Sequence, residues 1–158
     1  MLRDIHEWFF RAELRGEGSP WQVVQHVGVD LAEIGDGYCP DLIVVTAEVD
    51  LLARAEDRYL RPSEIGLVAE VTAHPSAHDD RRPESDKFTK WSGYAWTGVP
   101  YYLLVDRDPQ QPGVTLFGEP NRAEGTYEVL EEWKFGETIR LPEPFDVEVA
   151  TDKWKSWE

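Results

Sequence analysis

Two carboxylates and one lysine in the first two thirds of the chain are residue types that can hydrolyse phosphodiesters with a divalent cation. Asp41 lies in the segment CPDLIVV, Glu70 in the segment GLVAEVT, and Lys90 in a segment with helical spacing. Carboxylates from two successive hydrophobic strands can converge on one cation, while a nearby ammonium orients water or a scissile phosphate. Each carboxylate taken alone also fits a structural role, Asp41 as the end of a turn and Glu70 on a solvated edge.

Hard cations take oxygen ligands and retain several waters, so two carboxylates and one backbone carbonyl suffice when a phosphate completes the shell. We therefore predict that Asp41, Glu70 and the carbonyl of Val71 bind Mg²⁺ or Mn²⁺. Side chains alternate along a strand, which places Thr72 on the same face as Glu70 and Val71 on the other. Thr72 thus occupies a position where a lysine would be useful.

The predicted helix after this strand supplies the missing ammonium. Lys87 and Lys90 are three residues apart and would be neighbours along one flank of that helix. We assign the role to Lys90, with Lys87 as the alternative. The expected task is to orient the attacking water or to offset charge developing on the phosphate, rather than to act as a nucleophile.

Apolar periodicity predicts the elements that position these groups. A stripe at 3.6-residue spacing predicts an amphipathic helix over 2–14 that packs on a sheet. A second helix is predicted over 84–97, starting near Pro83 or Ser85 and ending before Gly98. Residues 49–58 fit either a short helix or a mobile loop. Strand character is found at 21–29, 42–45, 67–72, 101–105, 114–117, 127–132, 138–141 and 147–149. The fold class is therefore α/β: a mixed central β-sheet flanked by helices, with C-terminal antiparallel strands.

Length and composition favour one soluble domain over 1–158. Hydrophobic residues make up 41% of the 158 residues, and no apolar run approaches the roughly 20 residues of a membrane helix. The beginning lacks a basic flank followed by an apolar stretch, so we expect a cytoplasmic protein with no membrane association. The one cysteine, Cys39, cannot form an internal disulfide, and we expect it to be a buried apolar residue.

The net charge of −15 argues against a broad nucleic-acid-binding surface. Lys and Arg side chains that neutralise phosphates supply most of the non-specific affinity for nucleic acid. Binding of DNA, the favoured partner, would therefore need a bound cation or another source of positive charge.

Other residues have competing interpretations. A second metal cluster formed by His74, His78, Asp79 and Asp80 is disfavoured because no regular spacing aims these side chains together. The aromatic residues near Lys90 can stack on bases, but core packing is the preferred interpretation, most of all for Tyr94. The aromatic residues concerned are Trp91, Tyr94 and Trp96, and no role is assigned to His6 or His26.

The runs PDLIVV and LVAEVTAH precede a spaced pattern, D-x-x-x-K-x-x-x-Y-x-x-x-GVP-x-Y-x-LVD, which extends from Asp86 to Asp106 and includes Lys90. This combination resembles the Uma-two family of "putative restriction endonucleases", within the PD-(D/E)XK nuclease superfamily. The resemblance runs from Leu2 to Val149, more loosely in the later strands. It implies a restriction-endonuclease-like core, Asp41 and Glu70 as metal ligands, and Lys90 as a lysine relocated from strand to helix.

The amino end departs from that family, whose members begin with a further strand-forming segment carrying a glutamate that cannot be mapped onto Glu7, Glu13 or Glu17. A missing hairpin leaves a sheet edge for a neighbouring chain, so we expect a homo-oligomer. The leading functional hypothesis is a divalent-metal-dependent endonuclease. The alternative is a catalytically inactive oligomeric or protein-interaction module on the same scaffold.

Overall fold

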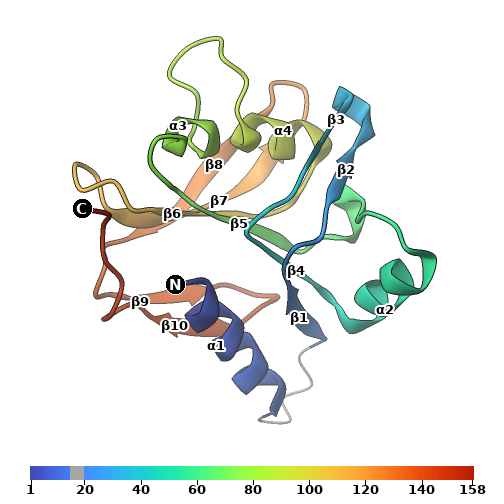
Figure 1. The fold of residues 1–158 in the computed structure, drawn as a ribbon, viewed down its shortest axis with the longest axis horizontal. Helices are drawn as coiled ribbons and strands as arrows, with labels where there is room; N and C mark the ends of the chain where they lie inside the picture. The colour runs from blue at the N-terminus through green and yellow to red at the C-terminus, as the bar shows by residue number, and fades with distance from the viewer. Residues whose placement is uncertain (15–19) are drawn as a thin grey trace.

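A six-stranded mixed sheet forms the centre of the protein in the computed structural model, which describes residues 1–14 and 20–158 (Figure 1). Its strand order is β1-β4-β5-β6-β7-β8. The pairings are antiparallel except that of β5 with β6, which are parallel and are connected through α3 and α4. The strands are β1 (Trp21–Val24), β4 (Leu42–Thr46), β5 (Leu67–Val71), β6 (Tyr102–Asp106), β7 (Gly113–Asn121) and β8 (Thr126–Trp133).

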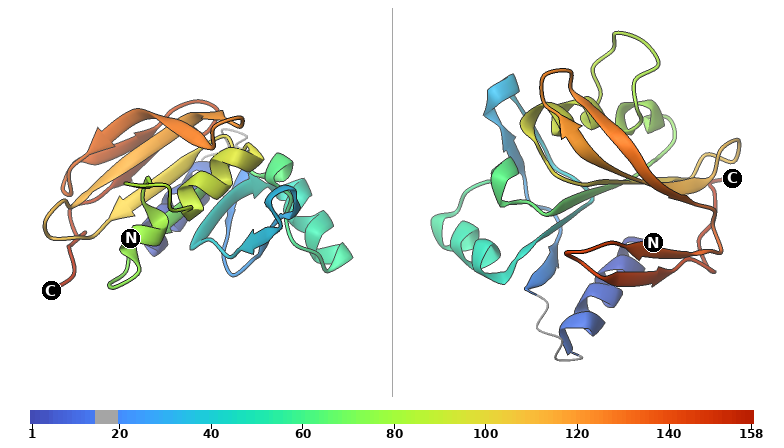
Figure 2. Two further views of the ribbon diagram at one scale, coloured as in Figure 1. Left: turned by 90° about the horizontal axis from the view of Figure 1, so that it is seen from above. Right: turned by 180° about the vertical axis from the view of Figure 1, so that it is seen from behind.

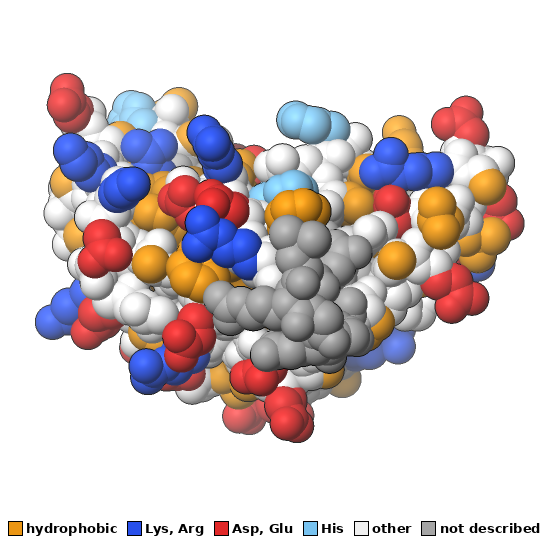
Figure 3. Space-filling model, turned by 90° about the horizontal axis from the view of Figure 1, so that it is seen from below, with side chains coloured by type: hydrophobic (Ala, Val, Ile, Leu, Met, Phe, Trp, Pro, Cys, Tyr) orange, Lys and Arg blue, Asp and Glu red, His pale blue; other side chains and the backbone are white. Residues whose placement is uncertain are grey.

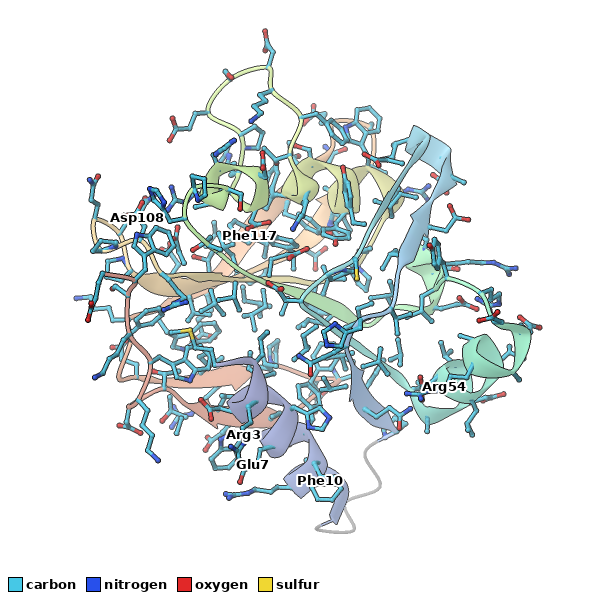
Figure 4. All side chains as sticks on the ribbon, viewed as in Figure 1. Arg3, Glu7, Phe10, Arg54, Asp108 and Phe117 are labelled. Atoms are coloured by element: carbon cyan, nitrogen blue, oxygen red, sulfur yellow. The ribbon has the colours of Figure 1, made fainter. Side chains whose placement is uncertain are left out.

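One face of the sheet is covered by α1 (Leu2–Leu14) and the hairpin of β9 (Thr138–Leu141) and β10 (Val147–Ala150) (Figures 1 and 2). The predicted apolar stripe of α1 is confirmed, because Ile5 and Phe9 are fully buried against this side of the sheet. The labelled side chains of Arg3, Glu7 and Phe10 project away from it (Figure 4).

The opposite face carries α3 (Ala77–Asp80) and α4 (Lys90–Thr97) (Figure 1). Trp91 of α4 is buried edge-on against Phe117 of β7, with ring centroids 5.8 Å apart. Figure 4 shows the labelled Phe117 between the sheet and this helical layer. Burying the flat apolar faces of such aromatic rings is what fixes α4 over the carboxyl-terminal half of the sheet.

A small hairpin of β2 (Val29–Leu31) and β3 (Asp36–Tyr38) leans on α4. Tyr38 packs edge-on against Tyr94 at 5.4 Å between ring centroids. A Cβ atom at Gly93 would lie 2.7 Å from the Tyr38 ring, so any larger residue at this point of the helix would require the ring to shift.

The remaining elements are α2 (Ala47–Glu56) and the short 3₁₀ turns η1 (Ala32–Ile34) and η2 (Pro62–Glu64). The sequence left residues 49–58 open between helix and loop, and the structure forms α2 there, with the Thr46 side chain accepting a hydrogen bond from Val49 N–H.

Two expectations are corrected, and one further helix is found. The second helix begins at Lys90 rather than near residue 84, because Thr89 caps it by accepting a hydrogen bond from Ser92 N–H. The four-residue helix α3 was not predicted. Cys39 is exposed rather than buried, since it lies in the connection between β3 and β4.

Candidate active site

Asp41 and Glu70 lie opposite each other at one end of the β4–β5 pair. The antiparallel register pairs Leu42 with Ala69, and its extension by one residue pairs Asp41 with Glu70. Cross-strand neighbours on one face have Cβ atoms about 5 Å apart. Glu70 shares its face with Val68 and therefore points toward α4. The two carboxylates that were singled out from the sequence are thus brought together.

A hydrogen bond fixes Asp41 against the neighbouring strand: Val71 N–H donates to Asp41 Oδ2 at 2.8 Å. In an extended strand the N–H and C=O of one residue point to the same side. The carbonyl of Val71 is therefore directed to the edge of β5 that Asp41 occupies. All three predicted metal ligands come from this one end of the β4–β5 pair.

Glu70 is only 1% exposed, and both of its carboxylate oxygens have partners. Lys90 Nζ lies 3.2 Å from Oε2, and the Tyr94 hydroxyl donates to Oε1 at 3.1 Å. The pKa of Glu70 is raised to about 7: burial has the largest effect, the charge of Lys90 opposes it, and the charges of Asp80 and Asp41 add to it.

Lys90 is the first residue of α4, which directs its side chain back toward the sheet. Burial lowers the pKa of its ammonium, but the charges and hydrogen bonds of Glu70 and Asp80 outweigh that effect and hold the pKa above its ordinary value. Lys87 lies before the helix, is largely exposed and pairs with Asp79 at 3.3 Å. The predicted helical flank shared by Lys87 and Lys90 is therefore wrong, and Lys90 is the lysine that contacts Glu70.

Asp80 is a further carboxylate at the site, which the sequence reasoning considered only within a disfavoured metal cluster. Its Oδ1 lies 2.8 Å from Lys90 Nζ. The residue is 5% exposed, and burial, with the charges of Asp41 and Asp79, raises its pKa against the effect of Lys90. Asp86, four residues before Lys90 in the sequence pattern, is exposed. A carboxylate from α3 thus lies beside the lysine.

A second polar group lies further along the same face of the sheet. Thr72 donates to Asp106 Oδ1 at 3.1 Å and accepts from Arg107 N–H at 2.8 Å. Arg81 contacts both oxygens of Asp106, at 2.7 and 2.9 Å. Thr72, which follows β5 at the position where a lysine would have been useful, is therefore part of a hydrogen-bond network that connects the end of α3 to β6.

The donor set at this end of the sheet fits a hard divalent cation. Asp41, Glu70 and the Val71 carbonyl offer only oxygen atoms, which Mg²⁺ and Mn²⁺ prefer. The buried Oδ1 atom of Asp80 lies beside them and forms an ion pair with Lys90 that lacks hydrogen-bond geometry. Within residues 1–14 and 20–158 no three His, Cys, Asp or Glu side chains form a ready ligand group. A bound cation would therefore need the carbonyl, water or substrate oxygens as well.

The four side chains of the disfavoured second cluster do not gather at one point. His78 pairs with Asp79 at 3.1 Å, whereas Asp80 contacts Lys90 and the ring of His74 lies 6.3 Å from that of Trp157. Core packing is confirmed for Trp91 and Tyr94, which are 1% and 0% exposed, while Trp96 is 38% exposed.

Over the described part of the face that carries α1, several Lys and Arg side chains gather at the upper left of Figure 3, and Asp and Glu side chains lie beside and below them. A cleft of about 680 Å³ lies over the ends of β6, β7 and β8 and has a mixed lining that includes Arg81, Arg82, Glu84 and Glu132. None of the described helices is both long and apolar enough to cross a bilayer.

Comparison with known proteins agrees with this fold. A crystal structure of a "putative nuclease belonging to DUF820" from Anabaena variabilis ATCC 29413 superposes with a TM-score of 0.56 at 12% sequence identity, over 96% of this chain and 75% of that chain. No curated protein matches. The model of the Uma2 family, described as "Putative restriction endonuclease", matches residues 2–152. Together with the mixed α/β fold, this match over nearly the whole length shows that the chain belongs to the Uma2 family.

Proposed function

We propose that the protein is a divalent-metal-dependent endonuclease that hydrolyses phosphodiester bonds of nucleic acid, with DNA as the favoured substrate. The observation that supports this most is that Asp41, just before β4, lies opposite Glu70 of β5 when the register is extended by one residue, with Lys90 in contact with Glu70. Carboxylates facing one another and a lysine beside them are the groups that metal-assisted hydrolysis requires.

In this proposal Asp41, Glu70 and the Val71 carbonyl hold Mg²⁺ or Mn²⁺. The cation supplies Lewis acidity toward the phosphate and the attacking water. Tyr94 and Val71 N–H orient the two carboxylates through the hydrogen bonds already described. Lys90 offers its ammonium to the attacking water or to the phosphate oxygens, where negative charge develops during the reaction.

Cleavage of single- and double-stranded DNA tests the proposal, with Mg²⁺ or Mn²⁺ and with EDTA. The informative variants are Glu70→Ala, Glu70→Gln and Lys90→Met, each compared with Asp79→Asn. Asp79 is an exposed carboxylate that pairs with His78 and Lys87 rather than with Glu70. We expect cation-dependent cleavage by the wild type and Asp79→Asn, and at least a hundredfold loss in the other three. Equal activity of Glu70→Ala and the wild type rejects the assignment.

The net charge of −15 favours a second candidate function, a catalytically inactive module that binds a protein partner or its own copies. In a homo-oligomer, the sheet edges at β1 and β8 are the places where a second copy can add strands. Calorimetric titration with Mn²⁺ separates the two functions. Binding that disappears in Asp41→Asn supports the endonuclease, whereas no Asp41-dependent binding supports the inactive module. Analytical ultracentrifugation measures the oligomeric state.

A further inference from the structure

The ammonium of Lys90 lies between two buried carboxylates from different elements. Its Nζ is 2.8 Å from Asp80 Oδ1 at the end of α3 and 3.2 Å from Glu70 Oε2 on β5. The Asp80 side chain is 7% exposed and the Glu70 side chain 2% exposed, whereas that of Lys90 is 31% exposed. The shorter contact is therefore made to the carboxylate that does not belong to the predicted ligand set.

The backbone around Asp80 is held from two sides. Tyr102, which is fully buried in β6, donates its hydroxyl to the carbonyl oxygen of Asp80 at 2.6 Å. The next residue, Arg81, contacts both carboxylate oxygens of Asp106 and also Asp108, at 2.9 Å. Because the backbone is held in this way and the side chain is buried, the Asp80 carboxylate stays within reach of the Lys90 ammonium.

The charges in the site favour different roles for the two carboxylates, with Glu70 binding the cation and Asp80 holding the ammonium. With Asp41, Glu70, Asp80 and Lys90 ionised, the group carries two net negative charges, which one divalent cation would balance. When Glu70 engages such a cation, the like charge repels the Lys90 ammonium from Glu70. Without another anion nearby, the flexible lysine would then turn to solvent.

We propose that Asp80 is the positioning residue that keeps the Lys90 ammonium in the site once Glu70 engages a divalent cation. This inference rests on the proposed function, because the ammonium is useful there only if it meets a phosphate or a water. Asp80 itself touches neither the reacting atoms nor, in this assignment, the cation. It acts through Lys90, and its effect on cleavage should therefore be on kcat rather than on KM.

The test follows the ammonium directly, in protein labelled with ¹⁵N at the lysine side chains. A protected NMR signal of the Lys90 ammonium is identified by its loss in Lys90→Met. In the wild type we expect this signal both before and after saturation with Mg²⁺. In Asp80→Asn it should persist without Mg²⁺, because Glu70 remains a partner, and be lost to exchange with water once Mg²⁺ is added.

Two further variants control for general effects. Asp79→Asn removes the adjacent, exposed carboxylate and should behave as the wild type. Asp80→Glu keeps the negative charge and should retain the Lys90 signal with Mg²⁺, at a shifted position. If thermal unfolding shows that Asp80→Asn does not fold, Asp80→Glu is used for the test instead. In the cleavage assay Asp80→Asn should lower kcat tenfold or more with KM within twofold, and Asp80→Glu should recover part of the loss.

Loss of the Lys90 signal in Asp80→Asn on addition of Mg²⁺ supports the positioning role. The positioning role is overturned if the Lys90 signal of Asp80→Asn survives the addition of Mg²⁺, or if the wild type shows no protected signal. If Asp80→Glu is used instead, loss of its Lys90 signal with Mg²⁺ overturns the role. The two proposals can fail separately. If the ammonium behaves as expected but no variant cleaves nucleic acid, the positioning role stands and the hydrolytic function fails. If the wild type cleaves and Asp80→Asn keeps both its kcat and its signal, only the positioning role fails.

Discussion

Asp41 receives the N–H of Val71 on its Oδ2 atom at 2.8 Å, so that a side chain closes the end of the β4–β5 pair where the backbone ladder stops. A backbone donor without a partner at this position would cost about 1–3 kcal/mol if buried. Asp41 thus has a structural task as well as the proposed metal-binding one, and variants can separate the two.

Asp41→Asn should keep the hydrogen bond, because the Asn side-chain oxygen can accept from Val71 N–H. We expect a change in the free energy of unfolding below about 1 kcal/mol, but a loss of Mn²⁺ affinity of tenfold or more, or about 1.4 kcal/mol. Asp41→Ala should show the same loss of affinity and a further destabilisation of about 1–3 kcal/mol. Calorimetry and urea unfolding measure the two quantities, and unchanged Mn²⁺ binding in both variants would contradict the metal assignment.

Tyr94→Phe removes the hydroxyl that donates to Glu70 Oε1, and Tyr127→Phe removes one that donates to the Val99 carbonyl at 2.6 Å. Both tyrosines are buried, so each variant should lower the free energy of unfolding by about 1–3 kcal/mol. Mn²⁺ affinity should change only in Tyr94→Phe, because only that hydroxyl orients a proposed ligand. Matching effects on affinity in the two variants would show that Tyr94 has no specific part in the site.

The stability of the cation-free protein should depend on Glu70 near neutral pH. The pKa of Glu70 in the folded protein is about 7, above the ordinary value of 4.5, so the folded state binds this proton more tightly than the unfolded chain. The resulting stabilisation is complete below pH 4.5 and is lost as the pH rises through 7. In EDTA, the wild type should lose up to roughly 3 kcal/mol relative to Glu70→Gln between pH 5 and 8. Parallel pH profiles from urea unfolding would refute this expectation.

For the ion pair of Arg58 and Glu64 we expect the opposite pH dependence of the free energy of unfolding. Both side chains are less than one fifth exposed, and the hydrogen bonds from Arg58 lower the pKa of Glu64. This stabilisation is present above the ordinary pKa of Glu and is lost as the pH falls through the lowered one.

We expect Glu64→Gln to cost about 1–2 kcal/mol at pH 7 and less at pH 3. The pair of Arg140 and Glu148, whose side chains are 72% and 60% exposed, supplies the control. Glu148→Gln should cost less than about 0.5 kcal/mol at either pH. Urea unfolding of both variants is the measurement, and a cost for Glu64→Gln that does not depend on pH would contradict the assignment.

The strands that carry Asp41 and Glu70 were predictable because a buried strand is a short apolar run between turn residues, and both runs have that form. The antiparallel register that sets the two carboxylates opposite each other was not, since nothing local specifies which strands pair. The structure places Asp41 opposite Glu70 and brings Lys90 into contact with Glu70, while the roles of these three residues stay a prediction.

The segment between β5 and α4 resisted prediction. Ser85 also offered a helix cap, but in the structure Thr89 caps the helix, and Trp91, two residues later, packs against Phe117 of the sheet. The contact of Asp80 with Lys90 was missed because Asp80 lies in this same segment. Its carboxylate reaches Lys90 through the placement of a four-residue helix, which has no periodicity that a sequence can display.

Gly93 has a consequence beyond its own turn of α4. Because no side chain separates the helix backbone from the ring of Tyr38, the β2–β3 hairpin rests directly on the element whose first residue is Lys90. A substitution such as Gly93→Ala would displace the Tyr38 ring and would therefore disturb the packing of both the β2–β3 hairpin and α4. The hairpin, which supplies none of the proposed catalytic groups, is thereby coupled through α4 to the amine that is proposed to act in cleavage.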